Sequence, residues 1–317
     1  MGDMPRHILA LGAATVVHAS GASVKVLRVT PTGTRQVTSF DVEVDVDWLD
    51  VAPDGQSVLI WGGWATRLWR WRAGVGHLLT AAYDVRGDEF GGAFAVIRGE
   101  VIMFIAQHGV LRGFTTDGRE RFAANLGTPR NFLVRSIAQL PGDRLALFGN
   151  EGSDPYNEVV TVFVDDILND PDSVQKALRL KNPIRDRAWS LAVGPCAPDS
   201  AVVFRNPEDE EIPEDDEDLE ELGDVGNFTG VYIRNLDSGT LIERIPYSGN
   251  AISGVRIVAT PRLVALEVRD GIDLISRGSG EAHEIRALAA TLDVSGMRAA
   301  WLTEDGHVEI RPIIELL

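Results

Sequence analysis

The chain has 317 residues, of which 44% are hydrophobic, and its formal net charge at pH 7 is −17. This apolar fraction can bury a substantial core, but the apolar stretches are all shorter than the roughly 20 residues that a membrane-spanning helix needs. The acidic balance argues against direct binding to nucleic acid or to an anionic membrane, because both need clustered Lys and Arg. The single cysteine, Cys196, excludes an internal disulfide and fits a reducing compartment.

The first twenty residues, MGDMPRHILALGAATVVHAS, combine a weakly charged front with a mildly apolar run. The run contains His7 and His18 and alternates as a strand does, which is atypical of a secretory signal. We therefore expect the first folded strands here and a cytoplasmic protein.

One pattern recurs along the chain: an apolar strand, a tight turn, a second strand, another tight turn and a third strand. It is clearest in WLDVAPDGQSVLIWGGWATRLWRWR, where Pro53-Asp54-Gly55 forms the first turn. The corresponding turns fall at or near Gly12, Gly55, Gly99, Gly142, Asp199, Pro261 and Gly296. They are 43, 44, 43, 57, 62 and 35 residues apart. Fourth-strand candidates lie between the units, and almost no segment has a helical period.

Seven units of about four short strands predict an all-β fold, a seven-bladed β-propeller with mostly four-stranded antiparallel blades. Radial packing of the blades would explain strands such as SVLIW and AVVF, which are apolar at consecutive positions. We expect one domain, 1–317, with blades at roughly 7–44, 45–85, 86–127, 128–181, 182–247, 248–287 and 288–317. Either the N-terminal strand completes the last blade, or that blade stays incomplete.

The segment APDGQSVLIWGGWATRLWRW resembles the WD40-like seven-bladed propellers, which carry an SPDG turn and an IRLWD third strand. On this resemblance Trp69 occupies the signature tryptophan position, and Arg70 stands where the family has Asp. The dipeptides Gly76-His77 and Gly306-His307 fall outside the family's positions, so the chain resembles a divergent member.

A strongly acidic tract interrupts the fifth blade between its second and third strands. The segment 208–224 contains twelve acidic residues and no Lys or Arg, and the rest of the chain has a net charge of −5. The composition predicts a disordered, solvated insertion over 206–228, and a docking arm for a basic partner is the functional alternative. The acidic loop residues are Glu208, Asp209, Glu210, Glu211, Glu214, Asp215, Asp216, Glu217, Asp218, Glu220 and Glu221.

Aromatic and charged residues recur just before the innermost strand of consecutive units, where the loops of a propeller ring one end of the central channel. Such anchors are enriched in binding hot spots. The predicted partner-binding residues are Trp48, Phe90, Phe132, Trp189, Arg130, Arg135, Arg185 and Arg187, with Trp64 at a turn; Asp47, Asp88 and Glu89 accompany them. The alternative is that the aromatic residues pack at the channel rim as core.

No nucleophile, phosphate-binding or zinc-ligand motif is present. We therefore favour a non-catalytic protein-interaction scaffold with no cofactor, whose partner is another protein with a basic surface. One alternative is a calcium-dependent, lactonase-like hydrolase, with Asp47, Glu89, Asn131 and Asn250 as candidate ligands. Another is an acidic antagonist that binds a basic protein by charge mimicry.

Overall fold

The computed structural model describes most of the chain, and all structural statements below refer to its described residues. These are residues 6–31, 33–42, 44–62, 67–72, 78–81, 90–107, 109–126, 132–151, 157–170, 172–174, 176, 187–188, 190–197, 199–206, 229–249, 256–293 and 297–316. The predicted acidic insertion lies outside them except for Asn206. No helix among them is long and apolar enough to cross a membrane.

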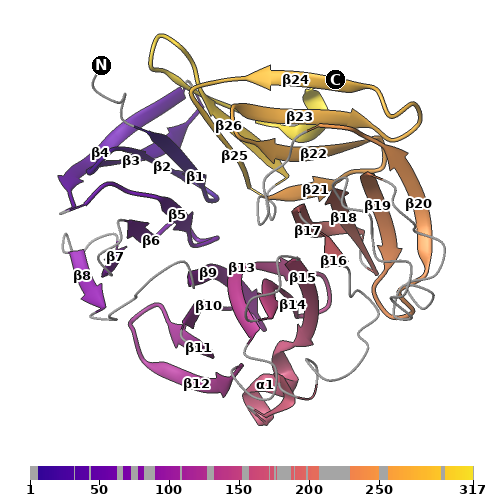
Figure 1. Ribbon diagram of the computed structural model, residues 1–317. Helices are drawn as coiled ribbons and strands as arrows, with labels where there is room; N and C mark the ends of the chain where they lie inside the picture. The colour runs from indigo at the N-terminus through magenta and orange to yellow at the C-terminus, as the bar shows by residue number, and fades with distance from the viewer. Residues whose placement is uncertain are drawn as a thin grey trace.

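The described strands form seven antiparallel sheets arranged around a common centre (Figure 1). Six are four-stranded blades in which successive strands pair in chain order. Blade 1 contains β1 (His7–Leu11), β2 (Thr15–Ser20), β3 (Ser23–Thr30) and β4 (Gly33–Asp41). Blade 2 contains β5 (Trp48–Val51), β6 (Ser57–Gly62), β7 (Arg67–Arg72) and β8 (Leu78–Ala81). Blade 3 contains β9 (Phe90–Ile97), β10 (Glu100–Gln107), β11 (Val110–Thr115) and β12 (Glu120–Asn125).

The second half of the ring follows the same plan. Blade 4 contains β13 (Phe132–Leu140), β14 (Arg144–Glu151), β15 (Asn157–Phe163) and β16 (Arg187–Ala188), with the helix α1 (Val164–Asn169) after β15. Blade 5 contains β17 (Ser190–Ala197), β18 (Ser200–Asn206), β19 (Gly230–Asn235) and β20 (Leu241–Pro246). Blade 6 contains β21 (Ile257–Ala259), β22 (Leu263–Val268), β23 (Gly271–Ser276) and β24 (Ala282–Arg286). The C-terminal sheet contains β25 (Ala289–Asp293), β26 (Arg298–Leu302) and β27 (Val308–Pro312), followed by the 3-10 turn η2 (Ile313–Glu315).

This arrangement confirms an all-β propeller with mostly four-stranded antiparallel blades, and it corrects the predicted count of seven blades. Six four-stranded blades are present, and the last repeat folds as a three-stranded sheet. The N-terminal strand does not complete that sheet, because β1 pairs only with β2. After β27 the chain turns inward instead of adding a strand, and Ile313 is fully buried in the core beside blade 6.

The core consists of apolar clusters between neighbouring sheets. Each of the seven clusters draws buried residues from two adjacent sheets, including one between the C-terminal sheet and blade 1. In that cluster Leu9 and Val16 of blade 1 meet Ala300 and Leu302 of the C-terminal sheet. The inner strands are apolar on both faces because both faces are covered, whereas outer strands such as β4 and β24 are mostly exposed.

The predicted turn at Pro53-Asp54-Gly55 is present and shows why its residues suit it. Gly55 has a φ of +68°, which glycine adopts without steric cost, and its amide donates to the Ala52 carbonyl at 2.7 Å. The Asp54 carboxylate accepts from the amide of Gln56 at 2.9 Å. Thr15 of blade 1 donates to the Gly55 carbonyl at 2.8 Å, so this turn also joins two blades.

Candidate functional site

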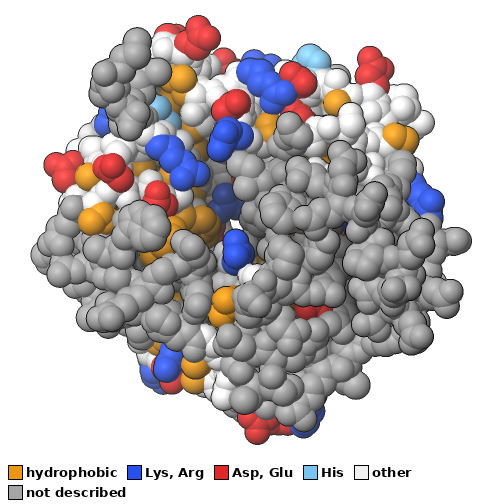
Figure 2. Space-filling model, in the orientation of Figure 1, with side chains coloured by type: hydrophobic (Ala, Val, Ile, Leu, Met, Phe, Trp, Pro, Cys, Tyr) orange, Lys and Arg blue, Asp and Glu red, His pale blue; other side chains and the backbone are white. Residues whose placement is uncertain are grey.

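A central cavity of about 720 Å³ lies where the innermost strands of all seven sheets converge. Figure 2 shows this face hollowed at its centre, with Lys and Arg side chains close to the opening. Each innermost strand contributes to the wall, as Leu9, Leu49, Ala93, Ile137, Val193, Ile257 and Leu292 illustrate. The propeller topology therefore gathers residues from nearly the whole length of the chain into one site.

Arg256 reaches from blade 6 across to blade 2 inside this cavity. Its guanidinium lies 3.0 Å from the Asp50 carboxylate and donates to the Leu49 carbonyl at 3.3 Å. The same group donates to the Thr291 hydroxyl at 3.0 Å and lies 3.5 Å from the Glu267 carboxylate. One arginine thus connects blade 2, blade 6 and the C-terminal sheet.

The two carboxylates beside Arg256 also hold neighbouring backbone. The Asp50 carboxylate accepts from the Phe94 amide of blade 3 at 2.9 Å. The Glu267 carboxylate accepts from the Leu292 amide of the C-terminal sheet at 2.6 Å. Since both carboxylates are occupied by protein donors, their role in this structure is to join sheets.

Burial and charge act in opposite directions on these groups. Burial raises the pKa of Asp50, and the nearby Arg256 guanidinium and the Phe94 amide offset part of that effect. Burial alone would lower the pKa of Arg256, but the Glu267 and Asp50 carboxylates outweigh it and raise that pKa. The arginine therefore stays charged, and its charge offsets part of the cost of burying the Asp50 carboxylate.

Two further polar contacts join neighbouring sheets beside the central cavity. The Gln139 side chain of blade 4 accepts from the Val96 amide at 3.1 Å and donates to the Val96 carbonyl at 2.9 Å, linking it to blade 3. Arg298 of the C-terminal sheet pairs with Asp293 at 2.6 Å and donates to the Gly12 carbonyl at 2.7 Å, linking that sheet to blade 1.

Three of the residues singled out in the sequence do line the central cavity: Asp47, Trp48 and Arg135. Trp48 is half-buried and packs against the cluster between blades 2 and 3. Arg135 is exposed and donates to the Asn150 side chain at 3.1 Å. Asp47 lies 3.8 Å from the guanidinium of Arg6, which lines the same cavity. We call Arg6, Asp47, Trp48 and Arg135 the rim residues.

Phe132 does not belong to this rim. It is fully buried in the cluster between blades 3 and 4, so its position corrects the prediction that its side chain faces a partner. The physical reason is register: Phe132 pairs with Glu151 at the start of β13, and its ring points between the blades.

The other predicted site residues lie outside what the structure describes. Phe90 and Arg187 are placed in strands β9 and β16, but their side chains are not described. The remaining ones fall outside the described residues altogether: Trp64, Asp88, Glu89, Arg130, Asn131, Arg185, Trp189, Asn250 and the acidic loop residues from Glu208 to Glu221. Among the described residues, no three His, Cys, Asp or Glu side chains gather in a way that could hold a metal ion.

The sequence analysis missed the polar residues that join the sheets. A signal exists for Asp50, which is the one polar residue of the innermost strand WLDV; Gln139 in FLVRSIAQL and Asp293 in AATLD share their strands with other polar residues and stand out less. A polar group there must be satisfied when it is buried. Their partners could not be named from the sequence, because Asp50 and Arg256 are 206 residues apart.

Comparisons with known proteins find similarity in the three-dimensional structure but none in the sequence. No protein-family model matches it, and no curated protein matches it by sequence. A structure of hydrazine synthase from Kuenenia stuttgartiensis is similar over 98% of this chain and 96% of that chain, with a TM-score of 0.62 and 11% identity.

The fold is that of a β-propeller.

Two further solved structures agree with this assignment. A chain in the mitotic checkpoint complex is similar to this propeller with a TM-score of 0.57 and 12% identity, over 99% of this chain and 92% of that chain. The WD40 domain of Neurospora crassa Pan2 has a TM-score of 0.55 and 8% identity, over 97% of this chain and 88% of that chain. At these identities the likeness concerns the fold alone.

Proposed function

We propose that this propeller is a non-catalytic protein-interaction scaffold that binds its partner at the mouth of the central cavity. The observation that carries the proposal is the convergence of the rim residues from blades 1, 2 and 4 at one opening. They combine a tryptophan, two arginines and a carboxylate, and tryptophan and arginine are the residues that most often dominate binding energy at protein interfaces.

The rim and the interior of the cavity have different chemistry, which favours surface docking over catalysis. Inside, Asp50 and Glu267 are held by Arg256 and by backbone amides. At the rim, Arg135 is exposed. The reactive types of side chain are thus engaged in joining sheets, while the groups that can reach a partner stand at the opening.

The net charge of −17 supports a partner with a basic surface, because a net negative field accelerates association with a cationic protein. The acidic tract 208–224 would add to this attraction as a second contact. The antagonist alternative shares this electrostatic requirement and predicts that the tract dominates affinity, whereas the scaffold proposal predicts that the rim does.

We also propose that the three-stranded C-terminal sheet closes the ring between blade 6 and blade 1. Two features support this: its apolar residues pack against both blade 6 and blade 1, and Arg298 donates to the Gly12 carbonyl. With this sheet in place the ring has no uncovered apolar face between its first and last blades.

The proposed function is tested by affinity capture from native lysate with four forms of the protein. These are the intact chain, Arg135→Glu at the rim, a deletion of 208–224, and Arg311→Glu on the exposed outer strand β27 as the matched charge control. We expect Arg135→Glu to remove a partner that the control retains. Capture of the same proteins by all four forms would contradict the proposal.

A further inference from the structure

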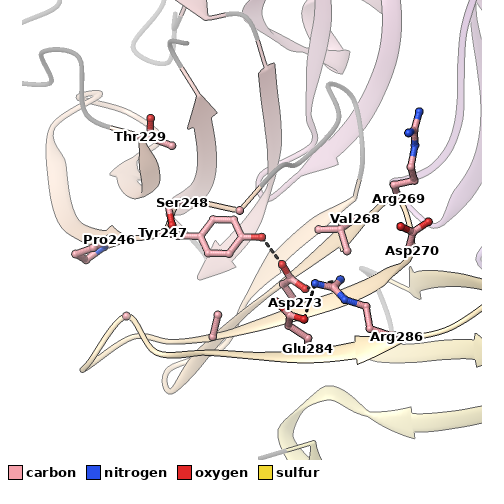
Figure 3. Close-up of a pocket in the computed structure, with 13 residues that line it drawn as sticks. Thr229, Pro246, Tyr247, Ser248, Val268, Arg269, Asp270, Asp273, Glu284 and Arg286 are labelled. Atoms are coloured by element: carbon pink, nitrogen blue, oxygen red, sulfur yellow. Dashed lines mark hydrogen bonds and ion pairs between the residues drawn. The ribbon is translucent and has the colours of Figure 1, made fainter. Parts of the chain in front are cut away.

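A second cavity, of about 960 Å³, lies between the end of β20 in blade 5 and the strands β23 and β24 of blade 6. We call it the outer pocket. The residues that carry the argument below are Tyr247, Asp270, Asp273, Glu284 and Arg286. Figure 3 shows the Tyr247 ring extending across the pocket toward Asp273, with Arg286 and Glu284 beside it.

The pocket is built around a buried hydrogen-bond network. The Tyr247 hydroxyl donates to the carboxylate of Asp273, which is buried. Arg286 donates to the other Asp273 oxygen at 3.2 Å and lies 2.7 Å from the Glu284 carboxylate. Burial, together with the bond to Asp273, raises the pKa of Tyr247, so the hydroxyl remains a neutral donor. The network therefore fixes the ring in place.

The glycine at 249 shows how closely this ring is held. A Cβ added at Gly249 would stand 2.0 Å from the Tyr247 hydroxyl oxygen, so any side chain there would displace the ring. The aromatic wall of the outer pocket is thus a rigid feature of the structure.

The side chains that line the outer pocket have a net negative charge, which favours a cation. The two carboxylates beside Arg286 already neutralise its guanidinium, which makes it a poor anion site. Asp270, in the hairpin between β22 and β23, is exposed and forms no ion pair with any other described residue. Arg269, its neighbour, extends away from the Tyr247–Asp273 network (Figure 3). The lining contains three carboxylates and two guanidinium groups, so one negative charge is uncompensated.

We propose that the outer pocket binds a lysine or arginine side chain of a partner protein. The methylene stem lies along Val268 and the small exposed part of the mostly buried Tyr247 ring, and the charged end is held by Asp270 and Glu284. Carboxylates beside an apolar wall recognise such a side chain, because the carboxylates hold its charged end and the wall covers its methylene stem. This inference rests on the proposed function in one respect: it assumes that the bound side chain belongs to a protein partner. The outer pocket itself contains none of the rim residues.

The test uses three short acetylated and amidated alanine–glycine peptides with a central lysine, norleucine or glutamate. Binding to the full chain is followed by amide NMR titration. We expect saturable binding of the lysine peptide, and weaker binding by about tenfold of both the norleucine and the glutamate peptide. In the double variant Asp270→Asn/Glu284→Gln, we expect the lysine peptide to bind about tenfold more weakly.

The matched control is Asp305→Asn/Glu309→Gln, which removes the same charge from the exposed turn before β27 and from a half-exposed position on that strand. It should leave the affinity unchanged. Equal losses in the two double variants, equal binding of norleucine, or no saturable binding of the lysine peptide would each overturn the inference. Arg135→Glu does not touch the outer pocket, so failure of the proposed function and failure of this inference are separable.

Discussion

The inner and outer strands of this propeller use the same kinds of charged residue for different purposes. Near the central cavity, Arg256 contacts the Asp50 carboxylate and the Leu49 carbonyl of blade 2, and Arg298 donates to the Gly12 carbonyl of blade 1. On the outer strand β27, Arg311 pairs with Glu309 on the same strand at 3.1 Å, and both side chains are largely exposed. Burial and the number of sheets connected, rather than the presence of an ion pair, therefore decide which charges stabilise the ring.

The largest expected effect comes from breaking the contact across the central cavity. Arg256→Met should lower the free energy of unfolding by about 3 kcal/mol, because it leaves the mostly buried Asp50 and Glu267 carboxylates without their cation. Urea unfolding measures this.

The matched outer variant, Arg311→Met, removes an exposed pair and should change the free energy of unfolding by about 0.5 kcal/mol or less. Equal losses in the two variants would show that inner and outer ion pairs contribute alike, which would contradict the comparison.

A smaller effect is expected where two inner strands approach each other most closely. A Cβ at Gly194 would stand 1.7 Å from the Ile257 carbonyl oxygen of the next blade, so Gly194→Ala must push the two blades apart. We expect a loss of about 1–3 kcal/mol in the free energy of unfolding. Gly278→Ala is the control, because no atom lies within 4 Å of its Cβ position. Unchanged stability of Gly194→Ala would mean that the blades are less tightly packed than the structure has them.

The smallest expected effect is a loss of stability at low pH, caused by a buried histidine on an inner strand. His18 of β2 lies 3.0 Å from His7, and burial together with the positive charges of His7 and Lys25 lowers the pKa of His18 to about 4. The unfolded chain, with a histidine pKa near 6.5, binds more protons in this range, so His18 reduces stability progressively as pH falls from about 6.5 to about 4.

Thermal melts at pH 7.5 and pH 5 measure this effect in the wild-type chain and in His18→Gln, which retains a hydrogen-bonding side chain that does not titrate. The wild-type melting temperature should fall by a few degrees more than that of the variant. Parallel falls in the two proteins would assign the pH dependence to other groups.

Much of the fold could be predicted from the sequence because its signals are local. The Pro53-Asp54-Gly55 turn and the consecutive apolar residues of SVLIW and AVVF specify a turn and strands covered on both faces, whatever the rest of the chain does. The candidate site was only partly predictable. Asp47 and Trp48, which precede or begin an innermost strand, line the central cavity, as does Arg135 within β13, whereas Phe132 begins β13 and is buried.

The sequence by itself determined the repeat, the all-β class and the acidic character of the chain, because turn chemistry, hydrophobic patterning and charge are properties of short segments. Only the tertiary structure decided that the last repeat is a three-stranded sheet, that Arg256 meets Asp50, and that Tyr247 meets Asp273 in the outer pocket. Each of these depends on which blades become neighbours across or around the ring. That is set by the closure of the whole ring, so no local pattern in the sequence identifies the partner of each residue.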